Sequence, residues 1–464
     1  MGRRGSLVFL RKDPMPPPIL IEIPAGREAV VRRLLALRDE LDALALAAPD
    51  GTVLDACERQ VLAGGRDLQR QLLTDAVARR IEAAEKGGAP IRVRGCGRAE
   101  ENRGPKDRQL VTAVGVIAVR RRYWQCRYGE PGGYVADAVV GLDGRYSRVV
   151  RTHLCRLAAD TSFAATSEHL KAILDVRVSA ETVRAVVEGH GAAMARFQPT
   201  DGATEAAFAK TPGEVEFAVD AGKVCTRQDG WKDLKIAVIS KREAGGPATP
   251  DEWRERSLPA AGMVLAFAMI ATAKTFRRSW RPRLRRLGVT AFAAVHAVGD
   301  GAAWIRKAVD RCLTGCRQTL DVYHACEHVA KCAERIFGEG TAAKGTAFER
   351  GRELLLATGW AGVCGWVGEL LAVDDETERE RRRPATERLM RYFAAHVGRL
   401  DYAGNLAAGR VIGSGAVEGQ AKTLGLRLKR RGARWDRGNV RSMAALVCVR
   451  HSAQWNSYWA SLAA

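Results

Sequence analysis

The chain has 464 residues, with 74 lysines and arginines against 53 aspartates and glutamates, a formal net charge of +21 at pH 7. Such an excess, gathered in local clusters, favours a polyanionic partner, most often a nucleic acid, although a solvated basic surface would show the same balance. No apolar run approaches the roughly 18 residues that a membrane-spanning helix needs, and the opening segment lacks the apolar core of a signal peptide. The 11 cysteines are scattered and odd in number, which argues against a disulfide framework. We therefore expect a cytoplasmic protein with no membrane association.

The first 87 residues are predicted to contain a tail and a helical segment. Residues 1–26 include the proline cluster MPPP and are expected to be a flexible tail. In residues 27–87, apolar side chains recur every three to four positions. This spacing predicts amphipathic helices.

Residues 88–145 are predicted to form a degenerate zinc-ribbon-like β-hairpin. The stretch RQLVTAVGVIAVRRRYWQC alternates apolar and polar residues and is rich in valine, as strands are. Cys96 precedes it and Cys126 ends it, where a zinc ribbon would carry two CxxC pairs. Val93 and Gly129 stand where the partner cysteines would be. Two thiolates cannot complete a tetrahedral zinc site, so we expect no zinc and interpret both cysteines as remnants, or as unrelated buried cysteines.

Residues 146–200 are predicted to form a helix-turn-helix DNA-binding region. The stretch TSFAATSEHLKAILDVRVSAETVRAVVEGHG indicates two helices and a short turn, with Ser179 as the N-cap of the second. Thr182 and Arg184 would then face outward at the start of the second helix, where DNA contacts are made in this motif. An ordinary helical hairpin shows the same pattern, and the two alternatives stay open.

Residues 214–324 are predicted to form the first part of a ribonuclease-H-like core. The patterns follow the order strand, strand, strand, helix, strand, helix, strand, helix. Three hairpin-linked strands followed by alternating helices and strands are typical of that sheet, and a different α/β sheet is the alternative. The helix before the fourth strand is expected to be interrupted at Pro282.

Two acids mark the strands of this core. Asp220 lies inside the first strand, in FAVDAGK, and Asp300 follows the fourth, in HAVGDGAAW. In a ribonuclease-H-like sheet the first and fourth strands are neighbours, so the carboxylates would lie side by side and repel unless a cation binds between them. Magnesium suits such a site. The alternatives are a strand-edge acid at 220 and a helix N-cap at 300.

A third acid stands in RVIGSGAVEGQAKTLGLRLKRRGARW. Glu418 is followed there by basic residues that would contact DNA phosphates, namely Lys422, Arg427, Lys429, Arg430, Arg431 and Arg434. Three carboxylates can hold two metal ions about 3.5–4 Å apart, an arrangement that stabilises both oxygens exchanged at a phosphodiester. The alternative is a surface helix with one ordinary glutamate.

At these residues the chain resembles the DDE transposases of bacterial insertion sequences, and within them the Kra-type group of the Mutator-like set. The segments that carry the resemblance are FAVDAGKV, VGDGAAWI, LDVYHACEH, IGSGAVEGQAKTLGLRLKRRGARW and HSAQWNSYW. The resemblance covers most of the chain after residue 27. One departure is Ala221, which stands between the first acid and its glycine.

The resemblance implies roles for particular residues. Asp220, Asp300 and Glu418 would be the catalytic and metal-binding triad. Asp321 and His324 would form the Asp-x-x-His signature of Mutator-like transposases, with His324 orienting the scissile phosphate or assisting proton transfer. A buried histidine hydrogen-bonded in the core is the alternative for His324.

The resemblance also implies the remaining domain organisation. Residues 325–409 would be a mostly helical insertion. Residues 410–464 would be the second part of the core, with the Glu418 helix and the basic DNA-binding segment.

The function implied by the resemblance is that of a transposase. It would bind the terminal repeats of its element and catalyse metal-dependent cleavage and strand transfer into target DNA, using two divalent ions, magnesium or manganese. We expect double-stranded DNA as partner, a homodimer or higher multimer on DNA, and association with the nucleoid. The alternatives are a captured or decayed transposase that only binds DNA, and a ribonuclease-H-like nuclease without strand transfer.

Overall fold

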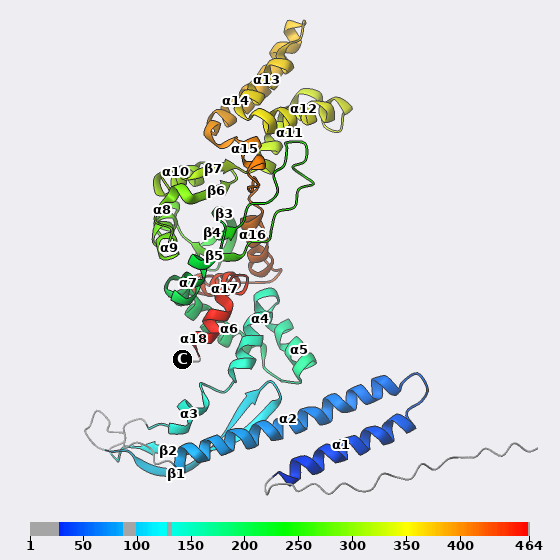
Figure 1. The fold of residues 1–464 in the computed structure, drawn as a ribbon, viewed down its shortest axis with the longest axis vertical. Coiled ribbons are helices and arrows are strands. Elements are labelled where there is room, and N and C mark those ends of the chain that lie inside the picture. Colours follow the sequence, from blue (N-terminus) through cyan, green and yellow to red (C-terminus); the bar gives the residue numbers. More distant parts are fainter. Residues whose placement is uncertain (1–26, 87–98, 128–131, 463–464) are drawn as a thin grey trace, which may run out of the picture. The chain divides into compact units, whose positions relative to one another are not determined.

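A computed structural model describes residues 27–86, 99–127 and 132–462. The chain divides into two compact units, Met1–Ser147 and Arg148–Ala464, whose elements are labelled in Figure 1. The fold is mixed α/β, as predicted, with a two-stranded hairpin in the first unit and a five-stranded mixed sheet in the second. No helix in the described part of the chain is both long and apolar enough to cross a membrane.

The first unit is a helical pair packed on a hairpin. Its elements are α1 (Glu28–Ala47), α2 (Val53–Lys86), β1 (Glu101–Thr112), β2 (Gly115–Gln125) and α3 (Val135–Val140). The two strands are antiparallel, which confirms the predicted hairpin. The apolar residues of α2 and the hairpin form one small core with α3, around Ile81, Ile117 and Ala136. Cys126 is buried, whereas Cys96 lies outside the described residues.

The second unit is built on a sheet of five strands in the order β5-β4-β3-β6-β7. The strands are β3 (Glu214–Thr226), β4 (Gly230–Arg242), β5 (Met263–Ile270), β6 (Val295–Gly299) and β7 (Arg317–Leu320). β3, β4 and β5 form an antiparallel meander, whereas β6 and β7 run parallel to β3. The prediction that the first and fourth strands are neighbours is therefore confirmed by the pairing of β3 with β6.

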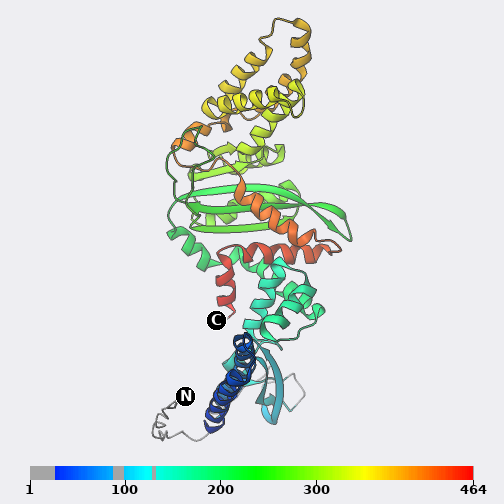
Figure 2. The ribbon, with the colours of Figure 1, turned by 90° about the vertical axis from the view of Figure 1, so that its right-hand side faces the viewer.

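Helices cover both faces of this sheet, as Figures 1 and 2 show. One face packs on α8 (Ala273–Arg278), α9 (Trp280–Arg286) and α10 (Ala303–Cys312) in an apolar core that includes Phe217 and Trp280. The other face contacts α16 (Gly415–Leu428) and α17 (Arg437–Arg450). The predicted interruption at Pro282 is wrong. The break falls at Ser279, and Pro282 lies in the first turn of α9, where its missing N–H removes no helical hydrogen bond.

Between β7 and α16 the chain is helical. The segments are α11 (Val322–Phe337), α12 (Ala342–Thr358), α13 (Trp360–Leu371), α14 (Glu376–Ala394) and α15 (Tyr402–Ala407), with a short 3-10 turn at Val397–Arg399. Helices α11 to α15 share an apolar core of their own, which contains Trp366 and Phe393. The buried Tyr402 hydroxyl donates to the Leu320 carbonyl at 3.0 Å and ties this core to the end of β7.

Within the described part of the second unit, four helices precede the sheet and one follows α17. They are α4 (Arg148–Asp160), α5 (Phe163–Leu174), α6 (Ala180–Phe197), α7 (Gly202–Lys210) and α18 (Gln454–Ser461). The Ser179 hydroxyl caps α6, as predicted, by accepting the Thr182 N–H at 3.2 Å. Helix α6 packs along α17 so closely that a Cβ at Gly191 would meet the Ser442 carbonyl oxygen at 2.3 Å. The second helix of the predicted helix-turn-helix is thus an integral part of the second unit.

Candidate metal and nucleic-acid site

Asp220 and Asp300 lie beside each other on neighbouring parallel strands. β3 and β6 pair with Val219 opposite Gly299, so the next residue along each strand is an aspartate. Asp220 Oδ1 accepts the following backbone N–H at 2.6 Å, and Asp300 Oδ1 accepts the N–H two residues on at 2.9 Å. The second oxygen of each carboxylate has no hydrogen-bond partner among the described residues and is not buried. Each acid therefore presents one oriented, unused oxygen.

Glu418 comes to these two acids from a distant part of the chain. It stands in the first turn of α16, is exposed, and accepts the Ser414 hydroxyl on Oε1 at 2.6 Å. Burial raises the pKa of Asp220, its backbone hydrogen bond opposes this, and the charges of Asp300 and Glu418 raise the pKa further. The structure thus brings Asp220, Asp300 and Glu418, here called the carboxylate cluster, within electrostatic reach of one another.

Asp321 plays a different part from these acids because both of its oxygens are occupied. It is fully buried and caps α11, where Oδ1 accepts the backbone N–H (2.8 Å) and the Nδ1 (3.2 Å) of His324. Its Oδ2 accepts the backbone N–H of Ser414 at 2.5 Å and lies 2.9 Å from the Ser414 hydroxyl oxygen. Asp321 therefore fastens the start of α11 to the start of α16 and fixes where Glu418 lies.

His324 is half-exposed, with 37% of its side chain accessible, so it is not a buried core histidine. Burial lowers the pKa of His324, but the hydrogen bond and charge of Asp321 and the charge of Asp300 outweigh this, and the pKa is raised. Because Nδ1 points to Asp321, Nε2 is the ring nitrogen left for a ligand. The imidazolium would partly offset the negative charge of the carboxylate cluster.

Two sets of residues compete as metal ligands. Ligand atoms of Asp321, His324 and Glu418 lie within 4.8 Å of one another, and within residues 27–86, 99–127 and 132–462 no other triple of acids, histidines or cysteines does so. Spacing alone would favour that set. Hydrogen-bond capacity favours Asp220, Asp300 and Glu418, because each oxygen of Asp321 already accepts a backbone N–H, whereas each member of the cluster keeps an oxygen free. We therefore assign Asp321 to positioning.

Ser414 was missed by the sequence prediction. It is buried, and its hydroxyl lies between Asp321 Oδ2 and Glu418 Oε1. A hydroxyl has one proton and donates to one carboxylate at a time. Asp321 Oδ2 already receives the Ser414 backbone N–H, so the hydroxyl proton is available to orient Glu418. The only sequence signal was the Gly-Ser-Gly turn four residues before Glu418.

The predicted DNA-binding residues of the basic segment fall into two groups. Most are exposed, namely Lys422, Lys429, Arg430, Arg431 and Arg434. Lys422 is one helical turn beyond Glu418 and forms no ion pair with any residue that the structure describes. Arg427 differs from the expectation of a solvent-facing phosphate contact, because only 3% of it is exposed.

The predicted contacts on α6 are placed less favourably for an anion. Arg184 forms ion pairs with Glu181 and with Glu188, the latter at 2.8 Å. Thr182 is half-buried, and its hydroxyl lies 2.9 Å from that of Ser179. The charge of Arg184 is therefore already balanced by two carboxylates on its own helix. DNA contact through Thr182 and Arg184 stays a prediction.

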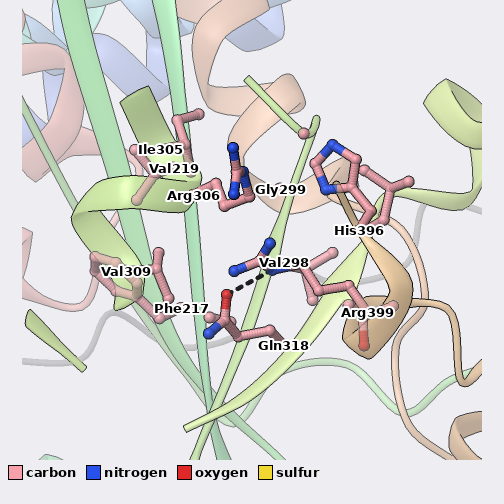
Figure 3. A pocket seen from close by; sticks show the side chains of 14 residues that line it. Phe217, Val219, Val298, Gly299, Ile305, Arg306, Val309, Gln318, His396 and Arg399 are labelled. Atoms are coloured by element: carbon pink, nitrogen blue, oxygen red, sulfur yellow. Dashed lines mark hydrogen bonds between the residues drawn. The ribbon is translucent and has the colours of Figure 1, made fainter. Parts of the chain in front are cut away.

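A small cavity at the end of β6 is too small for a substrate. It has a volume of about 30 Å³ and is bordered by Gly299, Gly301 and His396 (Figure 3). At its rim Arg399 Nε donates to Gln318 Oε1 at 2.7 Å. This volume holds one or two waters, which would satisfy the buried, unpaired Nδ1 of His396.

No protein-family model matches the sequence. No curated protein matches it either.

Proposed function

We propose that the protein is a DDE-type transposase with a ribonuclease-H-like core, which cleaves and joins DNA at the carboxylate cluster. The observation that carries the proposal is the convergence of Asp220, Asp300 and Glu418 from two neighbouring strands and a returning helix, each with one free oxygen. The strand order β5-β4-β3-β6-β7 and the Asp-x-x-His signature at Asp321 support it further. The net charge of +21 suits a DNA partner.

The donor set fits divalent cations. Asp220, Asp300 and Glu418 offer only oxygen, the ligand that magnesium and manganese prefer, and their mutual repulsion falls when a cation binds. Bound cations supply Lewis-acid activation and charge stabilisation at a phosphodiester. These three residues would hold them.

The other residues near the cluster orient the groups that react. Asp321 and Ser414 hold Glu418 in place through the start of α16. His324 Nε2 donates a hydrogen bond to a phosphate oxygen, and its charge offsets that of the phosphate. The exposed lysines and arginines after Glu418 hold the strand, so that cleavage and attack by the freed 3′-hydroxyl occur at one position.

The test is a strand-cleavage and joining assay. Purified protein is incubated with magnesium or manganese and DNA from both flanks of its gene, beside the variants Asp220→Asn, Asp300→Asn and Glu418→Gln. Cleavage and joining by the wild type alone would support the proposal. Cleavage without a joined product would favour a nuclease, and binding without cleavage under either metal would favour a captured DNA-binding protein.

A further inference from the structure

The far end of α16 borders a large basic pocket. The pocket has a volume of about 570 Å³ and lies between the starts of α5 and α6, the β3–β4 turn and the loop that joins α16 to α17. Its lining contains six arginines at positions 184, 227, 427, 430, 431 and 434, against two acids, Glu188 and Asp436. We call it the arginine pocket. Its volume is within the range of small-ligand sites.

The loop that forms one wall is fixed in place by hydrogen bonds. Trp435 Nε1 donates to the Leu428 carbonyl at 2.9 Å, and the Trp435 carbonyl accepts the Arg227 N–H at 2.9 Å. Asp436 Oδ1 accepts the Gln228 side-chain amide at 2.9 Å. The arginines of the loop are therefore carried on a scaffold that is anchored at both α16 and the β3–β4 turn.

Arg427 forms the floor of the arginine pocket. Its Nε donates to the Ala158 carbonyl at 2.6 Å, and its guanidinium carbon lies 4.8 Å from the Phe163 ring centroid and 4.9 Å from that of Trp435. Only 3% of the residue is exposed, and its Nη2 is buried and has no hydrogen-bond partner among the described residues. A buried guanidinium N–H without an acceptor is costly. An anion in the pocket would offset this cost by balancing the positive charge of Arg427.

The positive charge of the pocket is not neutralised from within. Glu188 is used by Arg184, and Asp436 accepts the Gln228 amide. Within the described parts of the chain, no carboxylate pairs with Arg227, Arg430, Arg431 or Arg434. Burial lowers the pKa of Arg427 to about 10, so this side chain stays charged at neutral pH. Clustered guanidinium groups favour a phosphate, whose oxygens they can bind in pairs.

We infer that the arginine pocket binds one phosphate of a DNA strand whose reacting bond lies at the carboxylate cluster. Arg427 is nine residues beyond Glu418 on α16, about 13.5 Å at ~1.5 Å per residue. At about 3.4 Å per nucleotide along one strand of a duplex, this is about four nucleotides. That the ligand is DNA rests on the proposed function, whereas the anion site rests on the pocket itself.

Binding without catalysis tests the pocket separately from the chemistry. Fluorescence anisotropy in EDTA measures the affinity for a labelled duplex of the gene flank, at several salt concentrations. The double variant Arg431→Ala/Arg434→Ala removes two exposed arginines of the pocket. The control is Arg278→Ala/Arg285→Ala, which removes two exposed arginines from α8 and α9 that form no ion pair with any described residue. We expect the pocket variant to bind at least 10-fold more weakly, with the salt slope reduced by about 1 to 2, and the control to bind nearly as the wild type. Equal losses in both would overturn the inference.

A second experiment locates the phosphate. Single uncharged methylphosphonates are placed along the duplex, and affinity is measured for the wild type and for Arg427→Gln. We expect one position, about four nucleotides from the cleaved bond, where the substitution weakens wild-type binding and adds no further loss in the variant. Additive losses at every position would contradict the inference. Displacement of the duplex by equimolar ATP would contradict it too, since the pocket would then take a free nucleotide. If the binding results are as expected but the protein cleaves no DNA, the proposed function is wrong and the inference that the pocket binds phosphate still holds.

Discussion

The two ends of α16 differ in the sign of the charge that is left unbalanced. At its start, the carboxylate cluster presents three carboxylate oxygens that have no hydrogen-bond partner among the described residues, and His324 lies beside it. At its end, the arginine pocket presents at least four arginines without carboxylate partners and a buried guanidinium with an unused N–H. Charges that are gathered and partly desolvated are costly unless an opposite charge arrives. One helix thus carries an acidic cluster at its start and a basic pocket at its end.

Removing the glutamate at the start of the helix should have the largest effect. We expect Glu418→Gln to reduce DNA cleavage below detection while leaving DNA affinity in EDTA nearly unchanged. Glu418 is exposed, so the fold should persist, and thermal unfolding would verify this. The control Glu387→Gln removes an exposed glutamate from α14 and should cleave as the wild type. Cleavage by Glu418→Gln at the wild-type rate would show that Glu418 is not part of a catalytic carboxylate cluster.

The Ser414 hydroxyl offers a smaller and more specific effect. Because it orients Glu418 without binding the metal itself, Ser414→Ala should weaken metal affinity or activity by about 10- to 100-fold. A magnesium titration of cleavage, followed for both proteins, would show the shift in the half-saturating concentration. A variant that matches the wild type at every concentration would remove Ser414 from the site.

Asp220 should destabilise the metal-free protein at neutral pH. Burial and the neighbouring carboxylates raise its pKa, so the native state binds this proton more tightly than the unfolded state. The tighter proton binding stabilises the native state at pH values below the unfolded pKa. This stabilisation is lost as the pH rises through the raised folded pKa. In EDTA at pH 8, Asp220→Asn should therefore have a higher Tm than the wild type. The difference should vanish near pH 3.

Divalent cations should stabilise the protein by relieving the repulsion between these carboxylates. Magnesium should raise the Tm of the wild type, because ligands that bind only the native state stabilise it, and it should raise the Tm of Asp220→Asn less. A variant that is less stable than the wild type in EDTA at pH 8, or that gains as much from magnesium, would contradict repulsion within the cluster.

The smallest effect concerns the helix that borders the arginine pocket. A Cβ at Gly191 would approach the Ser442 carbonyl oxygen to 2.3 Å, so Gly191→Ala should force α6 away from α17 and cost about 1–3 kcal/mol. Gly189→Ala is the matched control on the same helix, where a Cβ meets nothing within 4 Å, and it should stabilise by about 0.5–1 kcal/mol. Urea denaturation measures both. Equal stabilities would show that α6 does not pack on α17 as described.

The features that followed from the sequence are those set by element order. Three hairpin-linked strands followed by a crossover place the fourth strand beside the first, and the pairing of Val219 with Gly299 then sets Asp220 beside Asp300. Glu418 could be predicted as the third acid of this site because a single acid before a basic run is unusual. Each of these inferences needed only local patterns and one rule of topology.

The features that the sequence did not reveal depend on contacts between distant segments. Ser414 binds a carboxylate 93 positions away, and Arg427 donates to a carbonyl 269 positions away. A run of arginines gives no sign of which member is buried between two rings. The spacing of Arg184 from Glu181 and Glu188 does predict ion pairs on one helix face. The helix-turn-helix pattern predicted a DNA contact for the same arginine.

The most direct test of the central claim is a crystal grown with Mn²⁺ and measured for anomalous scattering. The account predicts strong anomalous density between the free oxygens of Asp220, Asp300 and Glu418, and its loss in crystals of Asp300→Asn. Density centred instead on Asp321 and His324, or crystals without a bound ion at millimolar Mn²⁺, would contradict the carboxylate cluster as the metal site.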